Sequence, residues 1–112
     1  MLIRSAVLEG SVAEADREDF DRQMRTNVLA AIARYPHIRE VRLRRQAEAE
    51  AGAPPVYMIF ELVFDDLAAM HAALASPVRQ EVRGEIGKAM QAFKGRVYHL
   101  IMEETAAAEI AP

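Results

Sequence analysis

The sequence predicts an α+β protein in which four antiparallel strands form one sheet and helices cover one of its faces. Three observations lead to this prediction: two-residue hydrophobic alternation in residues 38–45 and 56–64, helical periodicity in residues 16–35 and 67–93, and short apolar runs near both ends of the chain. The 112 residues are 52% hydrophobic and 28% charged, a balance typical of one small globular domain.

The first strand and the first helix are predicted from a change in the spacing of hydrophobic residues along the chain. Residues 2–8 form a short apolar-dominated run before Gly10 and are expected to be a strand. From Asp16 to Tyr35 hydrophobic residues recur every three or four positions, and acidic residues crowd the first turns, where the helix dipole favours them. This pattern predicts an amphipathic helix, which Pro36 is expected to end.

Two strands follow, joined by an exposed connection. Residues 38–45 place Val41 and Leu43 on one face and charged side chains on the other, which predicts an edge strand. Residues 56–64 are mainly apolar on both faces and are expected to form a central strand. Residues 46–55, rich in Ala and Glu and broken by two prolines, are expected to be a solvated loop.

The second half of the chain contains two helical segments and a last strand. The pair Asp65-Asp66 can cap a helix at residues 67–74, and Ser76 is expected to cap a second helix that runs toward Gly95. Residues 96–103 are predicted to form the last strand.

The resulting order, βαββαβ, is that of a ferredoxin-like sheet of four antiparallel strands. We expect a single domain over residues 1–104 and a flexible tail over residues 105–112.

One face of this sheet lacks a cover. Ile59, Val63 and apolar residues of the first and last strands are expected there, and exposing a large apolar side chain forfeits about 1.5–3 kcal/mol. Half a dozen such side chains would forfeit on the order of 10 kcal/mol, comparable to the stability of a domain. We therefore expect a second copy to cover this face in a closed two-fold dimer, a dimeric α/β barrel. Tyr57, Glu61, Arg4 and Arg42 are expected on the same face, either around a cavity or paired at the rim of the dimer.

Composition excludes several classes of function. The net charge of −3 argues against general nucleic-acid binding, and the absence of cysteine excludes disulfides and thiolate metal sites. Neither metal-ligand spacing nor a phosphate-binding glycine loop is present, so we expect no metal and no cofactor. No apolar stretch has the length of a membrane span or a signal peptide, so we expect a cytoplasmic protein without a membrane partner.

Several segments resemble the EthD-like family, named for ethyl tert-butyl ether degradation, within the dimeric α/β-barrel superfamily. They are residues 20–29, which begin at Phe20, residues 35–41, and residues 57–66 with 74–77. The resemblance implies a homodimeric barrel that binds a small organic molecule, as cofactor-independent oxygenases and cyclases of this superfamily do. It also implies a histidine seven residues after Phe20, where this chain has Asn27, an amide that cannot transfer a proton near neutral pH.

Five residues are candidates for a functional site. His99 and Glu61 are the candidates for proton transfer. Arg4, Asn27 and Tyr57 are the candidates for binding and orienting the ligand. The alternation of residues 96–103 does not decide which face of the sheet His99 occupies.

The sequence thus predicts a homodimer that binds a small, mostly apolar organic molecule between the sheet and the first helix. It leaves open whether the protein is an enzyme of the oxygenase or cyclase kind or a non-catalytic ligand-binding dimer. A third alternative, a haem-binding or haem-degrading barrel, depends on His71 alone.

Overall fold

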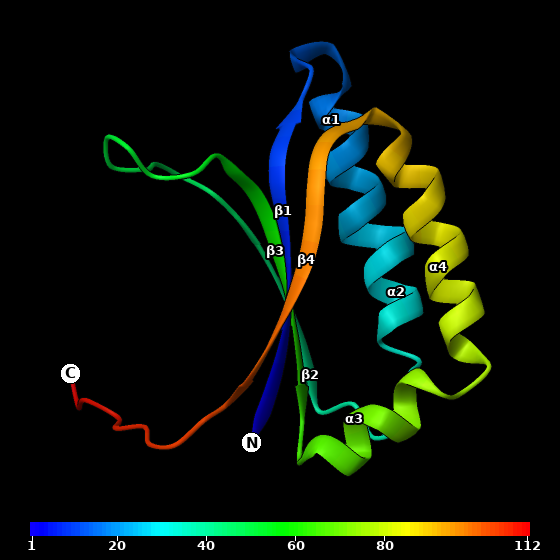
Figure 1. Ribbon diagram of the computed structural model, residues 1–112, viewed down its shortest axis with the longest axis vertical. Coiled ribbons are helices and arrows are strands. Elements are labelled where there is room, and N and C mark those ends of the chain that lie inside the picture. The colour runs from blue at the N-terminus through cyan, green and yellow to red at the C-terminus, as the bar shows by residue number, and fades with distance from the viewer.

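The computed structural model describes residues 1–112 and shows one four-stranded antiparallel sheet with helices packed on one face (Figure 1). The strand order is β2-β3-β1-β4, so β3 and β1 are central and β2 and β4 form the edges. The ferredoxin-like prediction is confirmed, as are the edge position of β2 and the central position of β3. In chain order the elements are β1 (Leu2–Val12), α1 (Glu14–Gln23), η1 (Met24–Val28), α2 (Leu29–Ile32), β2 (Glu40–Arg45), β3 (Val56–Phe64), α3 (Leu67–Leu74), α4 (Val78–Ala89), η2 (Met90–Ala92) and β4 (Phe93–Glu103).

The predicted first helix is one continuous helix with a π-helical turn inside it. Helix α1 leads into the π turn η1, and α2 completes the helix three residues before the predicted end at Tyr35. Phe20, Met24, Val28 and Ile32 recur at helical spacing and are all buried against the sheet.

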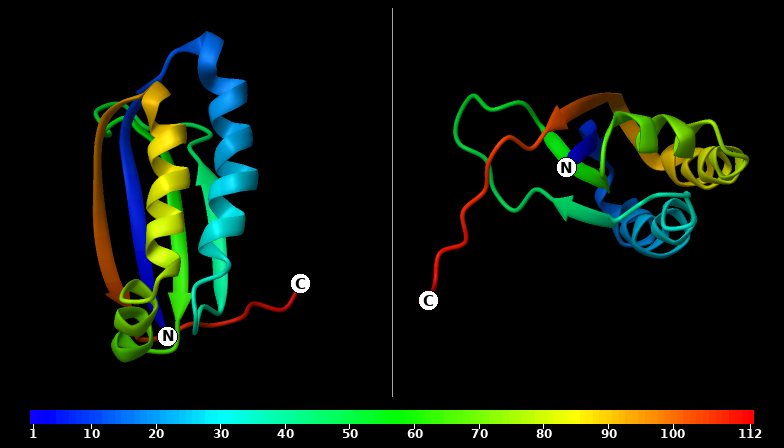
Figure 2. Two further views of the ribbon diagram at one scale, coloured as in Figure 1. Left: turned by 90° about the vertical axis from the view of Figure 1, so that its right-hand side faces the viewer. Right: turned by 90° about the horizontal axis from the view of Figure 1, so that it is seen from below.

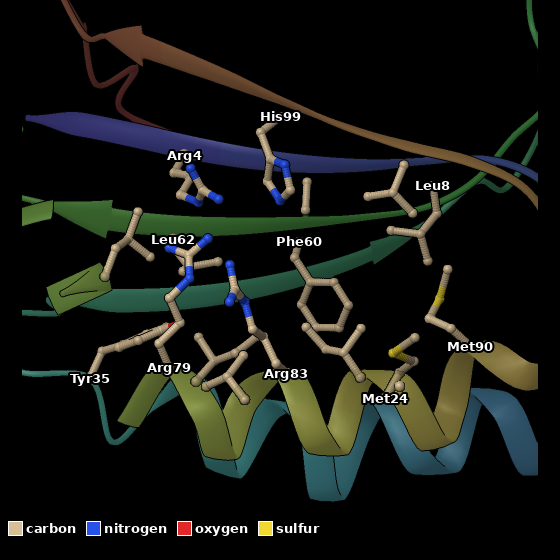
Figure 3. Close-up of a pocket in the computed structure, with 17 residues that line it drawn as sticks. Arg4, Leu8, Met24, Tyr35, Phe60, Leu62, Arg79, Arg83, Met90 and His99 are labelled. Carbon is tan, nitrogen blue, oxygen red and sulfur yellow. The ribbon is translucent and has the colours of Figure 1, made fainter. Parts of the chain in front are cut away.

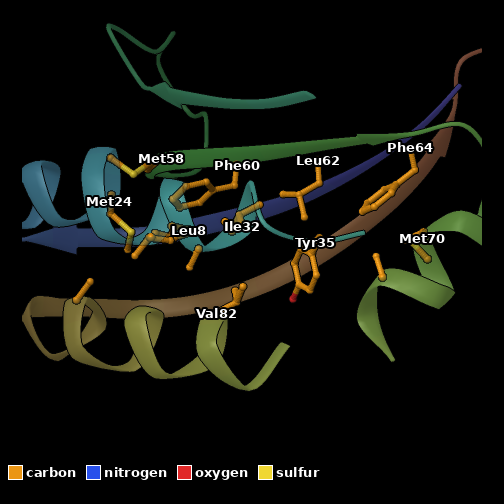
Figure 4. Close-up of a cluster of buried hydrophobic side chains, with 14 of the residues drawn as sticks. Leu8, Met24, Ile32, Tyr35, Met58, Phe60, Leu62, Phe64, Met70 and Val82 are labelled. Atoms are coloured by element: carbon orange, nitrogen blue, oxygen red, sulfur yellow. The ribbon is translucent and has the colours of Figure 1, made fainter. Parts of the chain in front are cut away.

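The hydrophobic core fills the space between the helices and the helix-facing side of the sheet (Figure 4). Alternate residues of β3 point into it, from Met58 through Phe60 and Leu62 to Phe64. Val7 and Val63 are also buried but lie outside this cluster, because odd-numbered positions of β1 and β3 face the opposite side of the sheet.

Gly10 and Gly95 were expected to end a strand and a helix, and both expectations are wrong. Strand β1 continues to Val12 and β4 begins at Phe93, so the two glycines lie opposite each other inside the β1–β4 pair. Their φ angles are 155° and 150°, and a Cβ on either would lie 2.1 Å from a carbonyl oxygen of the facing strand. Glycine is required here because the two backbones approach too closely for a side chain.

One of the two predicted helix caps is confirmed and the other is wrong. Asp66 is the N-cap of α3, and its carboxylate accepts a hydrogen bond from the backbone N–H of Ala69 at 2.8 Å, as predicted. Ser76 is not the N-cap of α4, a position that Pro77 occupies. The Ser76 hydroxyl instead donates to the carbonyl of Ala73 at 2.6 Å, because it follows α3 closely enough to bond the last turn of that helix.

Two segments project from the side of the sheet that the helices leave uncovered. Residues 46–55, between β2 and β3, extend away from the helices, and residues 104–112 run out beyond the end of β4 (Figures 1 and 2). The side chains of both segments are exposed throughout. No helix is long and apolar enough to cross a membrane.

Candidate functional site

A cavity of about 420 Å³ lies between the sheet and the helices (Figure 3). Its volume falls in the range of about 300–1,000 Å³ that is usual for small-molecule sites. Seventeen residues line it, twelve of them hydrophobic, and they come from three of the four strands, from the first helix and from α3 and α4. The cavity therefore has the size and the largely apolar walls of a ligand site.

Strand register determines which side chains of the sheet reach the cavity. Even-numbered residues of β1, including Arg4 and Ala6, point toward the helices. Ala6 pairs with His99 on β4, so His99 also lies on the helix-facing side and lines the cavity. The His99 side chain is partly buried in the cavity and partly open to solvent, because β4 is an edge strand.

One end of the cavity is polar and cationic. Arg4 and His99 extend into it from the sheet, and Arg79 and Arg83 extend from α4 on the opposite wall (Figure 3). Arg79 and Arg83 are four residues apart, which places them on one face of α4. Tyr35, just after α2, completes this end, and no carboxylate lines the cavity anywhere.

Burial and mutual repulsion change the proton affinities at this end. Burial, and next the charge of Arg79, lowers the pKa of Arg4. Burial, and next the charges of Arg4 and Arg79, lowers the pKa of His99, which favours the neutral imidazole, the form that can accept a proton. Burial raises the pKa of Tyr35, although the neighbouring arginines act in the opposite direction.

The other end of the cavity is apolar. Leu8 of β1, Met24 of η1 and Met90 of η2 form it, with Phe60 of β3 beside them (Figure 3). The two methionines have flexible, polarisable side chains that adapt to ligands of different shape. The cavity therefore offers an apolar region for a hydrocarbon body and a cationic region for a polar group.

The structure brings together only two of the five residues predicted for the site. Arg4 and His99 both line the cavity, although Arg4 was expected on the uncovered face. Glu61 does lie on the uncovered face, where its carboxylate accepts a 2.6 Å hydrogen bond from Arg44. Asn27 is exposed in η1 and does not line the cavity.

Tyr57 does not share a face with Glu61, contrary to the expectation from alternation. A bulge in the β1–β3 pairing makes Glu9 face Val56 and leaves Tyr57 unpaired, which reverses the alternation there. The Tyr57 ring packs edge-on against Phe20 at 5.5 Å, and its hydroxyl donates to the carboxylate of Asp21 at 2.7 Å. Tyr57 therefore lies on the helix side of the sheet, next to a separate, mainly polar cavity of about 410 Å³.

Sequence reasoning missed three residues of the cationic end: Tyr35, Arg79 and Arg83. A signal for the two arginines was present, because they are four residues apart and flank the apolar stripe of α4 at Val82. His71, on which haem binding depended, is exposed on α3 and does not line the cavity. No group of three or more histidine, aspartate or glutamate side chains lies close enough together to hold a metal ion.

Comparisons with known proteins identify the fold. No protein-family profile and no curated protein sequence matches the chain. Solved structures do match over nearly the whole chain, among them an EthD family protein from Bacillus halodurans with 19% identity and a TM-score of 0.71, covering 94% of this chain and 100% of the other.

Two further solved structures match with similar sequence identity and TM-score. SnoaB from Streptomyces nogalater, a cofactor-independent oxygenase, has 16% identity and a TM-score of 0.65, covering 95% of this chain and 94% of its own. A dimeric protein of unknown function and ferredoxin-like fold from Bacteroides fragilis has 16% identity and a TM-score of 0.64, covering 92% and 96%. The chain thus has the fold of these EthD family and oxygenase structures, and the resemblance seen in the sequence is confirmed at the level of the fold.

Proposed function

We propose that this protein is a homodimeric barrel that binds a small, mostly apolar organic molecule in the cavity between its sheet and its helices. The observation that carries the proposal is the cavity of about 420 Å³, lined mainly by hydrophobic side chains and cationic at one end. Binding sites for small molecules usually combine apolar walls with a few converging polar groups that fix the orientation of the ligand.

The dimer is proposed from the uncovered face of the sheet. On β4 this face carries Leu100 and Met102, which are 47% and 57% exposed. Apolar side chains from the two central strands lie beside them, and a second copy of the same face would cover those that are still exposed. The apolar residues of this face are Ile3, Val7, Ile59, Val63, Tyr98, Leu100 and Met102.

The shape of the single chain also supports a second copy. A compact protein of this mass exposes about 6,200 Å² of surface, whereas this chain exposes 7430 Å². Its radius of gyration is 14.9 Å, against about 13 Å for a compact chain of this length. Residues 46–55 and 104–112 account for part of the excess, and they project on the side where a partner sheet would lie (Figure 1).

Sedimentation velocity tests the dimer. We expect a species of twice the 12.5 kDa of one chain at micromolar concentration. A stable species of 12.5 kDa at that concentration would contradict the dimer but would leave the cavity, which one chain forms alone, untouched.

Proton abstraction is the chemistry that the cationic end supports best. Neutral His99 can take a proton from an acidic C–H or O–H group of the ligand. Arg4 and Arg79 then stabilise the negative charge left on the ligand. An anion of this kind can close a ring or react with dioxygen, which is the chemistry expected of a cyclase or of a cofactor-independent oxygenase.

A non-catalytic ligand-binding dimer is the second candidate, and the position of Glu61 favours it. The two residues expected to transfer protons do not act together, because Glu61 is on the uncovered face and His99 lines the cavity. Turnover of a bound ligand that His99→Gln abolishes, with binding retained, would support the enzyme. Turnover unaffected by His99→Gln would exclude His99 as its base.

Two glycines of α4 provide a matched test of the cavity. Gly87 lines it, Gly84 does not, and a Cβ at either position would meet nothing within 4 Å. Gly87→Leu should therefore fill the cavity and weaken binding of the neutral fluorophore N-phenyl-1-naphthylamine at least about tenfold. Gly84→Leu gains the same helix propensity and should bind like the wild type. Equal binding by both variants would contradict the cavity as the ligand site.

A further inference from the structure

The cationic end of the cavity contains three arginines for which the chain supplies no counter-charge. Eight of its basic side chains form ion pairs, but Arg4, Arg79 and Arg83 form none. They come from two different layers and point toward one another across the cavity (Figure 3). No aspartate or glutamate lines the cavity with them.

This arrangement is unfavourable for the empty protein. Arg4 and Arg79 are partly buried, and partly buried charges are normally paired; Arg83 is exposed but adds a third like charge to the same cavity, and like charges repel each other. Arg79 also lies in the first turn of α4, the end of a helix where a cation is disfavoured. Burial, and next the neighbouring charge of Arg79, holds the pKa of Arg4 below its ordinary value. A negatively charged group placed between these side chains would supply the missing counter-charge and offset their mutual repulsion.

We infer that the ligand of this cavity is an amphipathic organic anion whose carboxylate, sulfonate or ionised enol group lies between Arg4, Arg79 and Arg83. Its apolar body extends toward Leu8, Met24 and Met90 at the other end of the cavity. This inference rests on the proposed function, since it names the class of molecule that the same cavity binds. Planar anions suit guanidinium groups, which donate two parallel hydrogen bonds to them.

His99 couples anion binding to pH. The charged groups that face it are Arg4 on β1 and Arg79 on α4, with Arg83 and Tyr35 also at this end of the cavity. In the free protein burial and the two arginines lower the pKa of His99, whereas a bound anion would raise it by offsetting their charge. Binding therefore takes up a proton, and affinity for the anion rises as the pH falls through the range in which His99 titrates.

A matched pair of probes separates the head group from the apolar body. 1-Anilinonaphthalene-8-sulfonate carries a sulfonate, and N-phenyl-1-naphthylamine has the same rings without it. We expect the wild-type protein to bind the sulfonate at least about tenfold more tightly than the neutral probe. Equal affinities for the two probes would overturn the anion inference while leaving the cavity as the ligand site.

Arginine variants locate the head group. Arg79→Met and Arg83→Met each keep an apolar stem, so they should weaken the sulfonate about tenfold and leave binding of the neutral probe unchanged. Arg25→Met is the control, because Arg25 is exposed, unpaired and outside the cavity, and it should change neither probe. Loss of the sulfonate preference in Arg25→Met, or its retention in both cavity variants, would contradict the inference.

The pH dependence supplies a readout independent of these variants. Affinity for the sulfonate, which stays ionised throughout, should increase from about pH 8 to pH 6 in the wild type. His99→Gln should abolish the increase while preserving the preference for the sulfonate over the neutral probe. An unchanged pH dependence in His99→Gln would refute the coupling through His99. If neither probe binds the wild type, or if both bind Gly87→Leu as well as the wild type, the proposed function itself fails.

Discussion

Replacing Tyr57 by phenylalanine removes one hydrogen bond from the one charged side chain buried in the protein. Asp21 of α1 is 8% exposed and is the sole polar residue among the 20 buried ones. Its carboxylate accepts hydrogen bonds from Tyr57 at 2.7 Å and from Arg45 at 2.6 Å. These bonds join α1 to the start of β3 and the end of β2, so Asp21 attaches the first helix to the sheet.

The expected loss follows from the charge of the acceptor. A hydrogen bond to a charged group contributes about 1.5–3 kcal/mol, and phenylalanine preserves the ring that packs against Phe20, so no cavity forms. We expect Tyr57→Phe to lower the free energy of unfolding by about 2 kcal/mol. For a domain of this size the melting temperature should fall by on the order of 8 °C.

Urea unfolding at a fixed protein concentration measures this loss, since association would make stability depend on concentration. Tyr98→Phe is the matched control, because Tyr98 is a half-buried tyrosine of β4 whose ring centroid lies 5.2 Å from the guanidinium carbon of Arg96. Its hydroxyl forms no hydrogen bond within the chain, so its removal should cost less than about 0.5 kcal/mol when sedimentation shows the same association state, since Tyr98 lies on the uncovered face. Equal small losses in both variants would refute a structural role for Tyr57. Loss of probe binding with unchanged stability would make Tyr57 a ligand-binding residue after all.

Three further predictions concern the uncovered face, the cationic end and the paired glycines. Leu100→Glu should convert the dimer to a single chain in sedimentation. The control Leu67→Glu should leave the dimer intact, because Leu67 lies on α3 and is 43% exposed, close to the 47% of Leu100. A Leu100→Glu variant that is still dimeric would place the interface elsewhere. Because the pKa of His99 is lowered in the folded state, the unfolded chain binds more protons as the pH falls below about 6.5, so stability is lost on acidification. His99→Gln should reduce the difference in urea midpoint between about pH 7 and pH 5, and an unchanged difference would contradict the lowered pKa. Gly95→Ala should destabilise by at least about 1–3 kcal/mol, measured as a fall in the urea midpoint, and a neutral effect would contradict the close approach of β1 and β4.

The fold could be predicted because each element carries its own local pattern. The alternation of β3 correctly predicted which side of the sheet each side chain from Met58 to Phe64 occupies. The charged face of β2 correctly predicted that this strand lies at an edge of the sheet. Asp66 was predicted as a cap because the interaction spans only three residues. Local signals of this kind do not depend on the rest of the chain.

The site could be predicted only in part because it depends on pairing between distant segments. The bulge between Leu8 and Glu9 arises where two strands meet, and the alternation of β3 alone gives no sign that Tyr57 changes sides. Arg4 was assigned to the wrong face and His99 to neither, since apolar and polar residues occur on both faces of β1 and β4. Gly10 and Gly95 are separated by most of the chain, so their direct contact appears only in the folded structure.

The two faces of the sheet are assigned separate roles here, with the ligand on the helix side and a second copy on the uncovered side. Methyl-labelled methionine tests both roles in one NMR experiment, because the six methionines report on different places. Met24 and Met90 line the cavity, Met58 and Met70 lie in the core outside it, and Met102 is on the uncovered face.

Addition of 1-anilinonaphthalene-8-sulfonate should shift the methyl resonances of Met24 and Met90 most, through the ring currents of the bound probe. The Met102 resonance should respond instead to dilution of the protein, as the dimer dissociates. A probe-induced shift confined to Met102, with Met24 and Met90 unchanged, would place the ligand on the uncovered face and contradict this assignment.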